Sequence, residues 1–229
     1  KNTDDLITAY KSMNNEGILK TNSLGYDGKG QVRINQKSNL FETWENLGSD
    51  ESVLEEILEF KREISIMYFK STDNTDGFFP ISENYHENGI LKKTIAPAVL
   101  SMEIENNLKL QTKKLCKNLG LYGIIAIELF ELFDGSIVFN EIAPRPHNSF
   151  HWTLNGCDNS QFDILVRTMC GLPVKDVKPN GKWEMTNLIG QYEDIITETS
   201  KDQDYLLYLY GKEQTKPGRK MGHLNKRIN

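Results

Sequence analysis

Apolar residues recur every three or four positions in several stretches of this 229-residue chain, which is typical of helices that bury one face. The stretches cover residues 4–14, 39–47, 99–119 and 159–170. The apolar residues expected on the buried faces are Leu6, Tyr10 and Met13, then Ile104, Leu108, Leu115 and Leu119, and finally Phe162, Leu165, Val166 and Met169. Gly120 and Gly171 follow the last two stretches, where a helix commonly ends.

Shorter runs rich in Val, Ile and Tyr predict strands. These runs are residues 17–21, 31–35, 52–56 and 63–69, together with the longer runs 122–132 and 137–142. Residues 77–91 are expected to form a strand followed by a loop, and residues 182–223 short strands and turns. Helices and strands do not alternate strictly, and neighbouring strands are expected to be antiparallel. The pattern therefore predicts an α+β fold and argues against a doubly wound parallel sheet.

Composition narrows the class of protein. Hydrophobic residues make up 38% and charged residues 26% of the chain, which is the balance of a globular protein. The net charge of −5 argues against nucleic-acid binding, and no apolar stretch is long enough to span a bilayer. Three cysteines at irregular spacing predict free thiols in a reducing compartment, so we expect a cytoplasmic protein.

A lysine and a glycine-rich segment offer a first candidate for anion binding. Lys20 ends a predicted strand, and Gly25, Gly28 and Gly30 follow within a few residues. Glycine lets backbone amides turn toward a phosphate, and the lysine would add a positive charge. The segment lacks the Gly-Lys-Ser/Thr of a P-loop and the glycine order of a dinucleotide-binding fold. A glycine-rich hairpin that binds nothing is the alternative.

Two glutamates are expected to face each other across a hairpin. Asp134-Gly135, between two apolar runs, is typical of a two-residue turn. Such a turn pairs Glu128 with Glu141, with their β-carbons about 5 Å apart. Facing carboxylates repel each other unless a divalent cation such as Mg²⁺ lies between them, and Asn140 offers a neutral oxygen nearby. In the alternative, a longer turn shifts the register and leaves one glutamate in solvent.

A stiff polar loop follows directly after Glu141. Prolines alternate there with Arg145 and His147, and Asn148 comes next. An arginine can hold a carboxylate, bicarbonate or phosphate through paired hydrogen bonds. His147 and His151 have the spacing of a helical zinc pair, but the prolines argue against a helix there. A polar surface connection without a ligand is the alternative.

A basic turn lies near the end of this acidic chain. Lys212, Lys216, Arg219 and Lys220 surround a Pro-Gly pair, which predicts a phosphate-binding pocket or, alternatively, a solvated turn. Together with the glycine loop, the glutamate pair and the polar loop, this turn favours phosphoryl transfer from a magnesium nucleotide to a small anion.

The order of these motifs resembles the ATP-grasp enzymes, and within them the N5-carboxyaminoimidazole ribonucleotide synthases of purine biosynthesis. The motifs are Lys20-Thr21 with residues 25–31, Phe79-Pro80 through His86 to Ile90, the run 140–149, Ser160-Gln161-Phe162 and the run 217–223. The run Asn-Glu-Ile-Ala-Pro-Arg-Pro-His-Asn-Ser at 140–149 is highly specific. The resemblance implies an ATP-grasp fold with a lid subdomain (1–54), a central subdomain that carries the metal-binding hairpin (55–172), and a small, mostly-β C-terminal domain (173–229).

The resemblance also implies roles for individual residues. Those implied in ATP binding are Lys20, Gly25, Tyr26, Asp27, Gly28, Lys29, Gly30, Gln31, Glu55, Glu56, Ile57, Leu58, Glu63, His86, Asn140 and Glu141. Those implied in Mg²⁺ binding are Glu128 and Glu141. Those implied in catalysis, at the bicarbonate site, are Arg145, His147 and Asn148. Those implied in binding the ribonucleotide are Tyr26, Asp27, Lys212, Arg219 and Lys220.

The reaction implied by the resemblance uses ATP, bicarbonate and 5-aminoimidazole ribonucleotide. Bicarbonate attacks the γ-phosphoryl group to give carboxyphosphate, and the amine of the ribonucleotide then takes the carboxyl group and releases phosphate. No nucleic acid or membrane is implied as a partner, and the full-length protein is expected to be a homodimer. The alternatives are an ATP-grasp ligase with a different acceptor and a non-catalytic module that binds ATP.

The chain departs from the family's pattern at a few positions. Asn22 and Ser23 stand where the family usually has arginines, and Leu24 and Phe150 stand where it usually has glycine. These changes predict a stiffer lid and a different loop around residue 150. The family's N-terminal domain would precede this chain and a further segment would follow it, so we expect the isolated chain to bind nucleotide but to turn over poorly.

Overall fold

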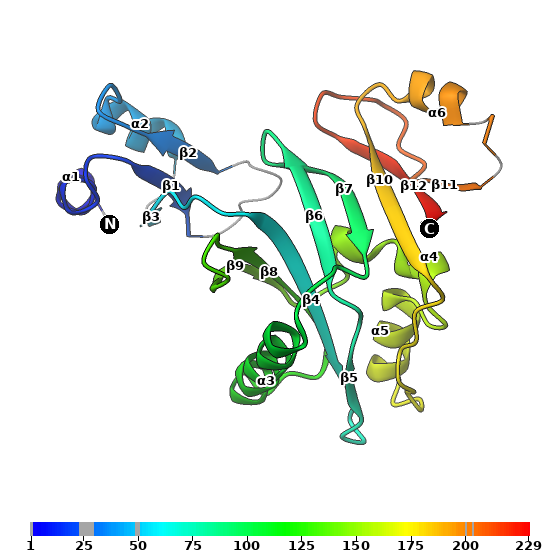
Figure 1. Cartoon of the computed structure of the whole chain (residues 1–229). Helices are drawn as coiled ribbons and strands as arrows, with labels where there is room; N and C mark the ends of the chain where they lie inside the picture. The colour runs from blue at the N-terminus through cyan, green and yellow to red at the C-terminus, as the bar shows by residue number, and fades with distance from the viewer. Residues whose placement is uncertain (1, 23–29, 49–50, 200, 203) are drawn as a thin grey trace. The chain divides into compact units, whose positions relative to one another are not determined.

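The computed structural model describes residues 2–22, 30–48, 51–199, 201–202 and 204–229 (Figure 1). The chain divides into two compact units. Unit 1 comprises residues 1–59 and 88–90, and unit 2 comprises residues 60–87 and 91–229. The break after Glu59 lies close to the boundary expected after residue 54, whereas residues 173–229 belong to the same unit as the central strands.

Unit 1 combines helices α1 (Thr3–Ser12) and α2 (Leu40–Leu47) with an antiparallel sheet in the order β2 (Gln31–Ile34), β1 (Gly17–Thr21), β3 (Ser52–Glu55). The sequence predicted each of these elements. Asn2 and Asn39 cap the helices by accepting hydrogen bonds from the backbone amides of Asp5 and Glu42. The core of the unit consists of Leu6, Tyr10, Leu19 and Ile34.

Unit 2 is built on one long sheet in the order β11-β12-β10-β7-β6-β4-β8-β9, with β5 paired to β4. The strands are β4 (Arg62–Lys70), β5 (Asp76–Phe78), β6 (Ser82–Glu87), β7 (Ile90–Ala96), β8 (Gly123–Glu131), β9 (Ile137–Ala143), β10 (Lys182–Ile189), β11 (Tyr205–Leu209) and β12 (Lys220–Ile228). The helices are α3 (Met102–Asn118), η1 (Asn148–Phe150, a 3₁₀ turn), α4 (Thr153–Gly156), α5 (Gln161–Met169) and α6 (Glu193–Thr199). The expected α+β fold with antiparallel neighbours is confirmed.

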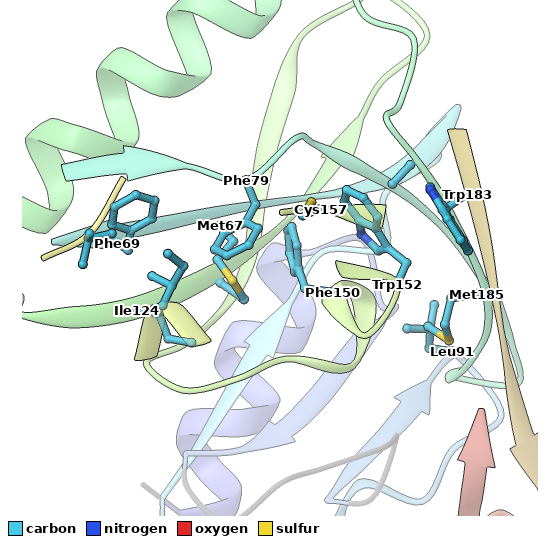
Figure 2. Close-up of a cluster of buried hydrophobic side chains, with 14 residues drawn as sticks. Met67, Phe69, Phe79, Leu91, Ile124, Phe150, Trp152, Cys157, Trp183 and Met185 are labelled. Carbon is cyan, nitrogen blue, oxygen red and sulfur yellow. The ribbon is translucent and has the colours of Figure 1, made fainter. Parts of the chain in front are cut away.

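Both faces of the central strands are buried, which explains why their sequences are continuous apolar runs. On one face, alternate residues of β4 and β8 pack against the loop before α4 and against α5 (Figure 2). On the other face, the intervening residues pack against α3. Phe150, which stands where the family usually has glycine, is fully buried on the first face and makes an edge contact with Phe79, with ring centroids 6.1 Å apart.

Two of the predicted strand regions differ from the structure. Residues 77–91 do not end in a loop, because Asn88 and Gly89 adopt positive φ angles of 52° and 74° and turn β6 directly into β7. Asn-Gly favours this two-residue hairpin turn. Residues 182–223 contain the long strand β10 and, beyond the expected turns, helix α6 and the start of the long strand β12. In the fold these strands extend the central sheet.

The predicted buried faces of two helices are partly wrong. In α5, Phe162, Val166 and Met169 are exposed, while Gln161, Ile164 and Thr168 are buried. Apolar residues lie on both sides of this helix, so periodicity alone selected the wrong side. In α3, Leu108 is buried as expected with Ile104 and Leu115 beside it, but Leu119 at the end of the helix is exposed. Among the described residues, none of the helices has the length and hydropathy that a membrane span requires.

Candidate active site

The apolar face shown in Figure 2 becomes polar toward one end of the strands. On β8, Ile124 and Ala126 are followed on the same face by Glu128. On β10, Trp183 and Met185 are followed in the same way by Asn187. We call the polar ends of these rows the polar band, and its members are Glu141, Glu128, Glu63, His86, Asn187 and His223. The sheet itself therefore gathers polar groups from strands that are distant in sequence.

The hairpin β8–β9 brings Glu128 and Glu141 opposite each other, as predicted, but the turn is not the predicted one. Leu132 donates its backbone N–H to Ser136, so the turn contains three residues, with Gly135 at a φ of +83°. A three-residue turn alone would place Glu128 opposite Asn140. The register shifts by one residue between Glu128 and Leu129, which makes Asn140 the extra residue of a bulge and restores the glutamate pair.

The two glutamates, with His147 beside them, form a cluster in which the carboxylates could hold a metal ion. Ligand atoms of Glu128, Glu141 and His147 lie within 4.8 Å of one another. Burial, together with the nearby charge of Glu141, raises the pKa of Glu128 to about 7. A divalent cation would remove this repulsion, and carboxylate oxygens are ligands that Mg²⁺ prefers. The donor set therefore fits a hard divalent cation.

His147 is a neutral imidazole with a fixed orientation. Burial, together with the charge of Arg145, lowers its pKa to about 3. Its Nδ1 lies 2.8 Å from the hydroxyl of Ser149 and 3.4 Å from the backbone N of Ser149, which donates to it. Nδ1 is thus an acceptor, and the ring proton lies on Nε2, which is 3.5 Å from the Glu128 carboxylate.

Buried amides hold the loop that carries His147. The Gln161 side chain accepts a hydrogen bond from the backbone N–H of His147 (2.8 Å) and donates one to its carbonyl (2.9 Å). Asn148 and Asn187 exchange hydrogen bonds through their side-chain amides, and Asn187 also donates to the Leu91 carbonyl at 2.9 Å. The Asn148 side chain is thus occupied in anchoring the loop. Among the predicted loop residues, Arg145 is exposed and hydrogen-bonds only locally, to the Pro146 carbonyl (3.0 Å).

Glu63 and His86 form a pair within the polar band. Their closest atoms, Glu63 Oε2 and His86 Nδ1, are 2.5 Å apart. Although burial opposes the charged form of His86, the contact with Glu63 raises its pKa above the usual value. Both residues were predicted to contact ATP, and the structure brings them together.

The basic turn lies beside the same band. Burial is the main cause of the low pKa values of His147 and His151. The charge of Lys220 lowers both values further, which places Lys220 near these two rings. Lys212 donates to the Lys220 carbonyl at 2.5 Å, and Arg219 donates to the Gln214 carbonyl at 2.9 Å.

The remaining predicted residues lie in unit 1. Lys20 and Glu55 share one face of the small sheet and form an ion pair of 2.5 Å. Gln31 begins β2, and Gly30, directly before it, has a φ of +76°, which favours glycine. Glu56, Ile57 and Leu58 follow β3 and precede β4. Gly25, Tyr26, Asp27, Gly28 and Lys29 lie outside the described residues.

Sequence reasoning missed several residues that organise this site. Gln161 and His223 appeared only as parts of resemblance motifs, and Asn187 and Tyr210 received no role. The alternation of residues along the strand could have indicated Asn187, because Asn187 lies two positions after Met185 and four after Trp183, on the same buried face.

The chain is similar to known proteins in both sequence and structure. A family model described as the ATP-grasp domain matches residues 1–162, and one described as the phosphoribosylaminoimidazole carboxylase C-terminal domain matches residues 184–227. The chain is 39% identical to the bifunctional purine synthesis protein purC/E of Dictyostelium discoideum, over 96% of this chain and 24% of that protein. It is 36% identical to the N5-carboxyaminoimidazole ribonucleotide synthase of Bacillus subtilis, over 98% of this chain and 59% of that protein.

Solved structures give the same result. The ADP complex of N5-carboxyaminoimidazole synthetase from Staphylococcus aureus matches with a TM-score of 0.91 and 35% identity, over 100% of this chain and 61% of that one. The Aspergillus clavatus synthase, in complex with ADP and 5-aminoimidazole ribonucleotide, matches with a TM-score of 0.88 and 28% identity, over 99% of this chain and 61% of that one. The chain thus spans about three fifths of the length of these synthases.

Proposed function

Because the chain belongs to the ATP-grasp family, with the fold its sequence predicted, we propose that it carries out the ATP-dependent carboxylation of 5-aminoimidazole ribonucleotide with bicarbonate. The single observation that carries this proposal is the facing pair of partly buried Glu128 and exposed Glu141 beside neutral His147, close to the basic turn. That arrangement offers a place for a magnesium nucleotide, a small anion and a phosphorylated acceptor side by side.

The reaction balances in two steps. An oxygen of bicarbonate attacks the γ-phosphorus of ATP, the bond to the β-phosphate oxygen breaks, and ADP leaves. The ribonucleotide amine then attacks the carboxyl carbon of carboxyphosphate, the carbon–oxygen bond to phosphate breaks, and the amine loses a proton. The products are N5-carboxyaminoimidazole ribonucleotide, ADP and phosphate.

Individual residues have proposed roles in binding the magnesium nucleotide. Glu128 and Glu141 would hold Mg²⁺, with Asn140 nearby, and the ion would neutralise the charge of the transferred phosphoryl group. Lys20 and the segment 25–31 would contact the phosphates, and residues 55–58 would contact the adenine through their backbone. Glu63 would bind the ribose hydroxyls and His86 would approach the phosphates, and their contact with each other keeps both in place.

The polar loop would bind bicarbonate and its phosphorylated product. Arg145, exposed and without a carboxylate partner among the described residues, is suited to an anion. His147 keeps a proton on Nε2 and can donate it in a hydrogen bond without adding a charge. Asn148 sets the position of the loop through Asn187. A water-poor pocket at this loop would protect the labile mixed anhydride.

The basic turn would bind the phosphate of the ribonucleotide. Lys212, Arg219 and Lys220 supply the charges, and Tyr26 and Asp27 would complete that site. We further propose the division into a lid (1–54), a central part (55–172) and a C-terminal part (173–229). A cytoplasmic location and a homodimeric complete protein are part of the same proposal.

ADP release tests the function. It is measured in the complete polypeptide with ATP, Mg²⁺ and bicarbonate, with and without 5-aminoimidazole ribonucleotide. The ribonucleotide should raise ADP release sharply in the wild type, and Glu141→Ala should abolish the increase. Glu103→Ala, which changes an exposed glutamate of α3, serves as the matched control and should behave as the wild type. ADP release that ignores the ribonucleotide would indicate another acceptor, and tight ATP binding without any release would indicate a non-catalytic module.

A further inference from the structure

A stack of aromatic rings at β12 has no role in the function proposed above. His223 is 1% exposed and lies between the rings of His151 and Tyr208, at centroid distances of 4.9 and 4.7 Å. The rings are nearly parallel, with interplanar angles of 20° and 12°. The Nδ1 atom of His223 lies 2.8 Å from the hydroxyl oxygen of Tyr210. The imidazole is therefore held on both faces and at one edge.

On one side, the stack supports the basic turn through Tyr210. The backbone N–H of Tyr210 donates to the Met221 carbonyl at 2.9 Å, which continues the pairing of β11 with β12. The ammonium of Lys212 lies 5.5 Å from the centre of the Tyr210 ring and donates to the Lys220 carbonyl. The attraction between a cation and the face of an aromatic ring holds the Lys212 ammonium over the Tyr210 ring. The position of Tyr210 thus determines where the Lys212 charge lies.

On the other side, the stack reaches the loop of candidate catalytic residues through His151. The backbone N–H of His151 donates to the Asn148 carbonyl at 3.1 Å. The side chain of Asn225, also on β12, donates to the His151 carbonyl at 3.1 Å. Ring contacts therefore join the loop 145–148 to the basic turn 212–220, two segments that are far apart in sequence.

Hydrogen bonding favours one tautomer of His223. Burial, together with His151, lowers its pKa to about 3, so the ring is neutral and has a single N–H. Its Nε2 is buried and has no hydrogen-bond partner among the described residues. A proton on Nε2 would be an unpaired buried donor, whereas a proton on Nδ1 is donated to Tyr210. The Tyr210 hydroxyl then keeps its own hydrogen for another acceptor.

We infer that His223 is a positioning residue for the phosphate monoester of the acceptor. It donates from Nδ1 to Tyr210, which fixes the ring beneath Lys212 and leaves the Tyr210 hydroxyl to donate to the phosphate. The inference rests on the proposed function, because the acceptor is the ribonucleotide of that reaction. The stack thus adds two features to the basic turn: it places the Lys212 ammonium over the Tyr210 ring, and it orients the Tyr210 hydroxyl through His223.

Steady-state kinetics of the complete polypeptide test this role. His223→Phe and Tyr210→Phe each remove the hydrogen bond and keep a ring in place. Each should raise the KM for 5-aminoimidazole ribonucleotide about 5- to 10-fold, the cost of one oriented hydrogen bond, and leave the KM for ATP within about twofold. Because His223 acts through the Tyr210 hydroxyl, the double variant should be no worse than Tyr210→Phe alone. His223→Asn, whose amide N–H lies near the position of Nδ1, should recover part of the loss.

A matched control separates positioning from a general structural role. Tyr205→Phe makes the same chemical change at the start of β11, the strand that Tyr210 follows, outside the stack and at a ring that Lys226 covers. It should leave both KM values unchanged. The inference is wrong if the stack variants raise both KM values together, if their effects on the acceptor add in the double variant, or if they change only the melting temperature.

Nitrogen NMR of the His223 ring gives a readout that does not depend on turnover. The wild type should show a protonated Nδ1 and an unprotonated Nε2, and Tyr210→Phe should shift the Nδ1 signal. A protonated Nε2 in the wild type would overturn the inference even where turnover is normal. If the wild type shows the expected tautomer but ADP release ignores the ribonucleotide, the proposed function fails and the acceptor role of His223 fails with it.

Discussion

Gln161 holds the loop that carries His147 more directly than any charged residue does. Its side chain is fully buried and pairs with both the N–H and the C=O of His147, at 2.8 and 2.9 Å. Gln161→Met keeps the length of the side chain but leaves both backbone groups unpaired in a buried position. Each unpaired group costs about 1–3 kcal/mol, so the free energy of unfolding should fall by about 2–6 kcal/mol.

Urea unfolding followed by tryptophan fluorescence measures this change. Gln111→Met, on the exposed face of α3, makes the same substitution outside the core and should cost less than about 0.5 kcal/mol. If Gln161→Met costs no more than Gln111→Met, then the loop does not depend on this amide, and the argument for its fixed geometry fails.

Gln161→Glu adds a pH dependence whose sign follows from the same two bonds. A carboxyl group can both donate and accept at this position only when it is protonated, so its native pKa should exceed its unfolded value. Such a group contributes stability below the unfolded pKa and loses it as the pH rises through the native pKa. The difference from wild type should therefore be small near about pH 4.5 and large near about pH 7.5. A difference that does not change with pH would contradict this reasoning.

Three further predictions concern the neighbouring elements. Glu63→Gln should lower the pKa of His86 in an NMR titration, since burial opposes the charged ring and only Glu63 offsets it strongly; an unchanged pKa would refute the pairing. Ser160→Ala removes the capping box that begins α5 and should lower the free energy of unfolding by about 1 kcal/mol in urea, while an unaffected stability would contradict the cap. Gly135→Ala meets no atoms within 4 Å but is strained at a φ of +83°, so it should cost about 1–2 kcal/mol and Gly135→Asn clearly less; equal costs would count against the three-residue turn.

Much of the fold could be predicted because its elements are locally encoded. Asn and Ser caps, glycines at helix ends and apolar runs set the positions of α1, α3, β4 and β8. The glutamate pair was predicted correctly from a turn of the wrong length, because the bulge at Asn140 compensates for the extra turn residue. The residues of a turn can be recognised in a sequence, but the bulge at Asn140, four residues beyond the turn, has no comparable sequence signal.

Long-range polar contacts could not be predicted in the same way. Asn148 meets Asn187 across 39 residues, and His151 meets Asn225 across 74 residues. Such pairs depend on β10 and β12 joining the central sheet, which the pattern of the C-terminal residues did not indicate. The buried face of α5 was predicted wrongly for a related reason. Two of its buried residues, Gln161 and Thr168, are polar, and the hydrogen bonds that they make could not be read from the sequence.

We propose that bicarbonate is activated by the γ-phosphoryl group of ATP before the amine attacks. Bicarbonate labelled with ¹⁸O tests it directly, because carboxyphosphate carries one bicarbonate oxygen into the released phosphate. With ATP, Mg²⁺ and 5-aminoimidazole ribonucleotide, and at times short compared with the loss of label to water, the account predicts one ¹⁸O atom in each phosphate formed. Phosphate without the label, released at the same rate, would mean that water accepts the phosphoryl group and would contradict the account.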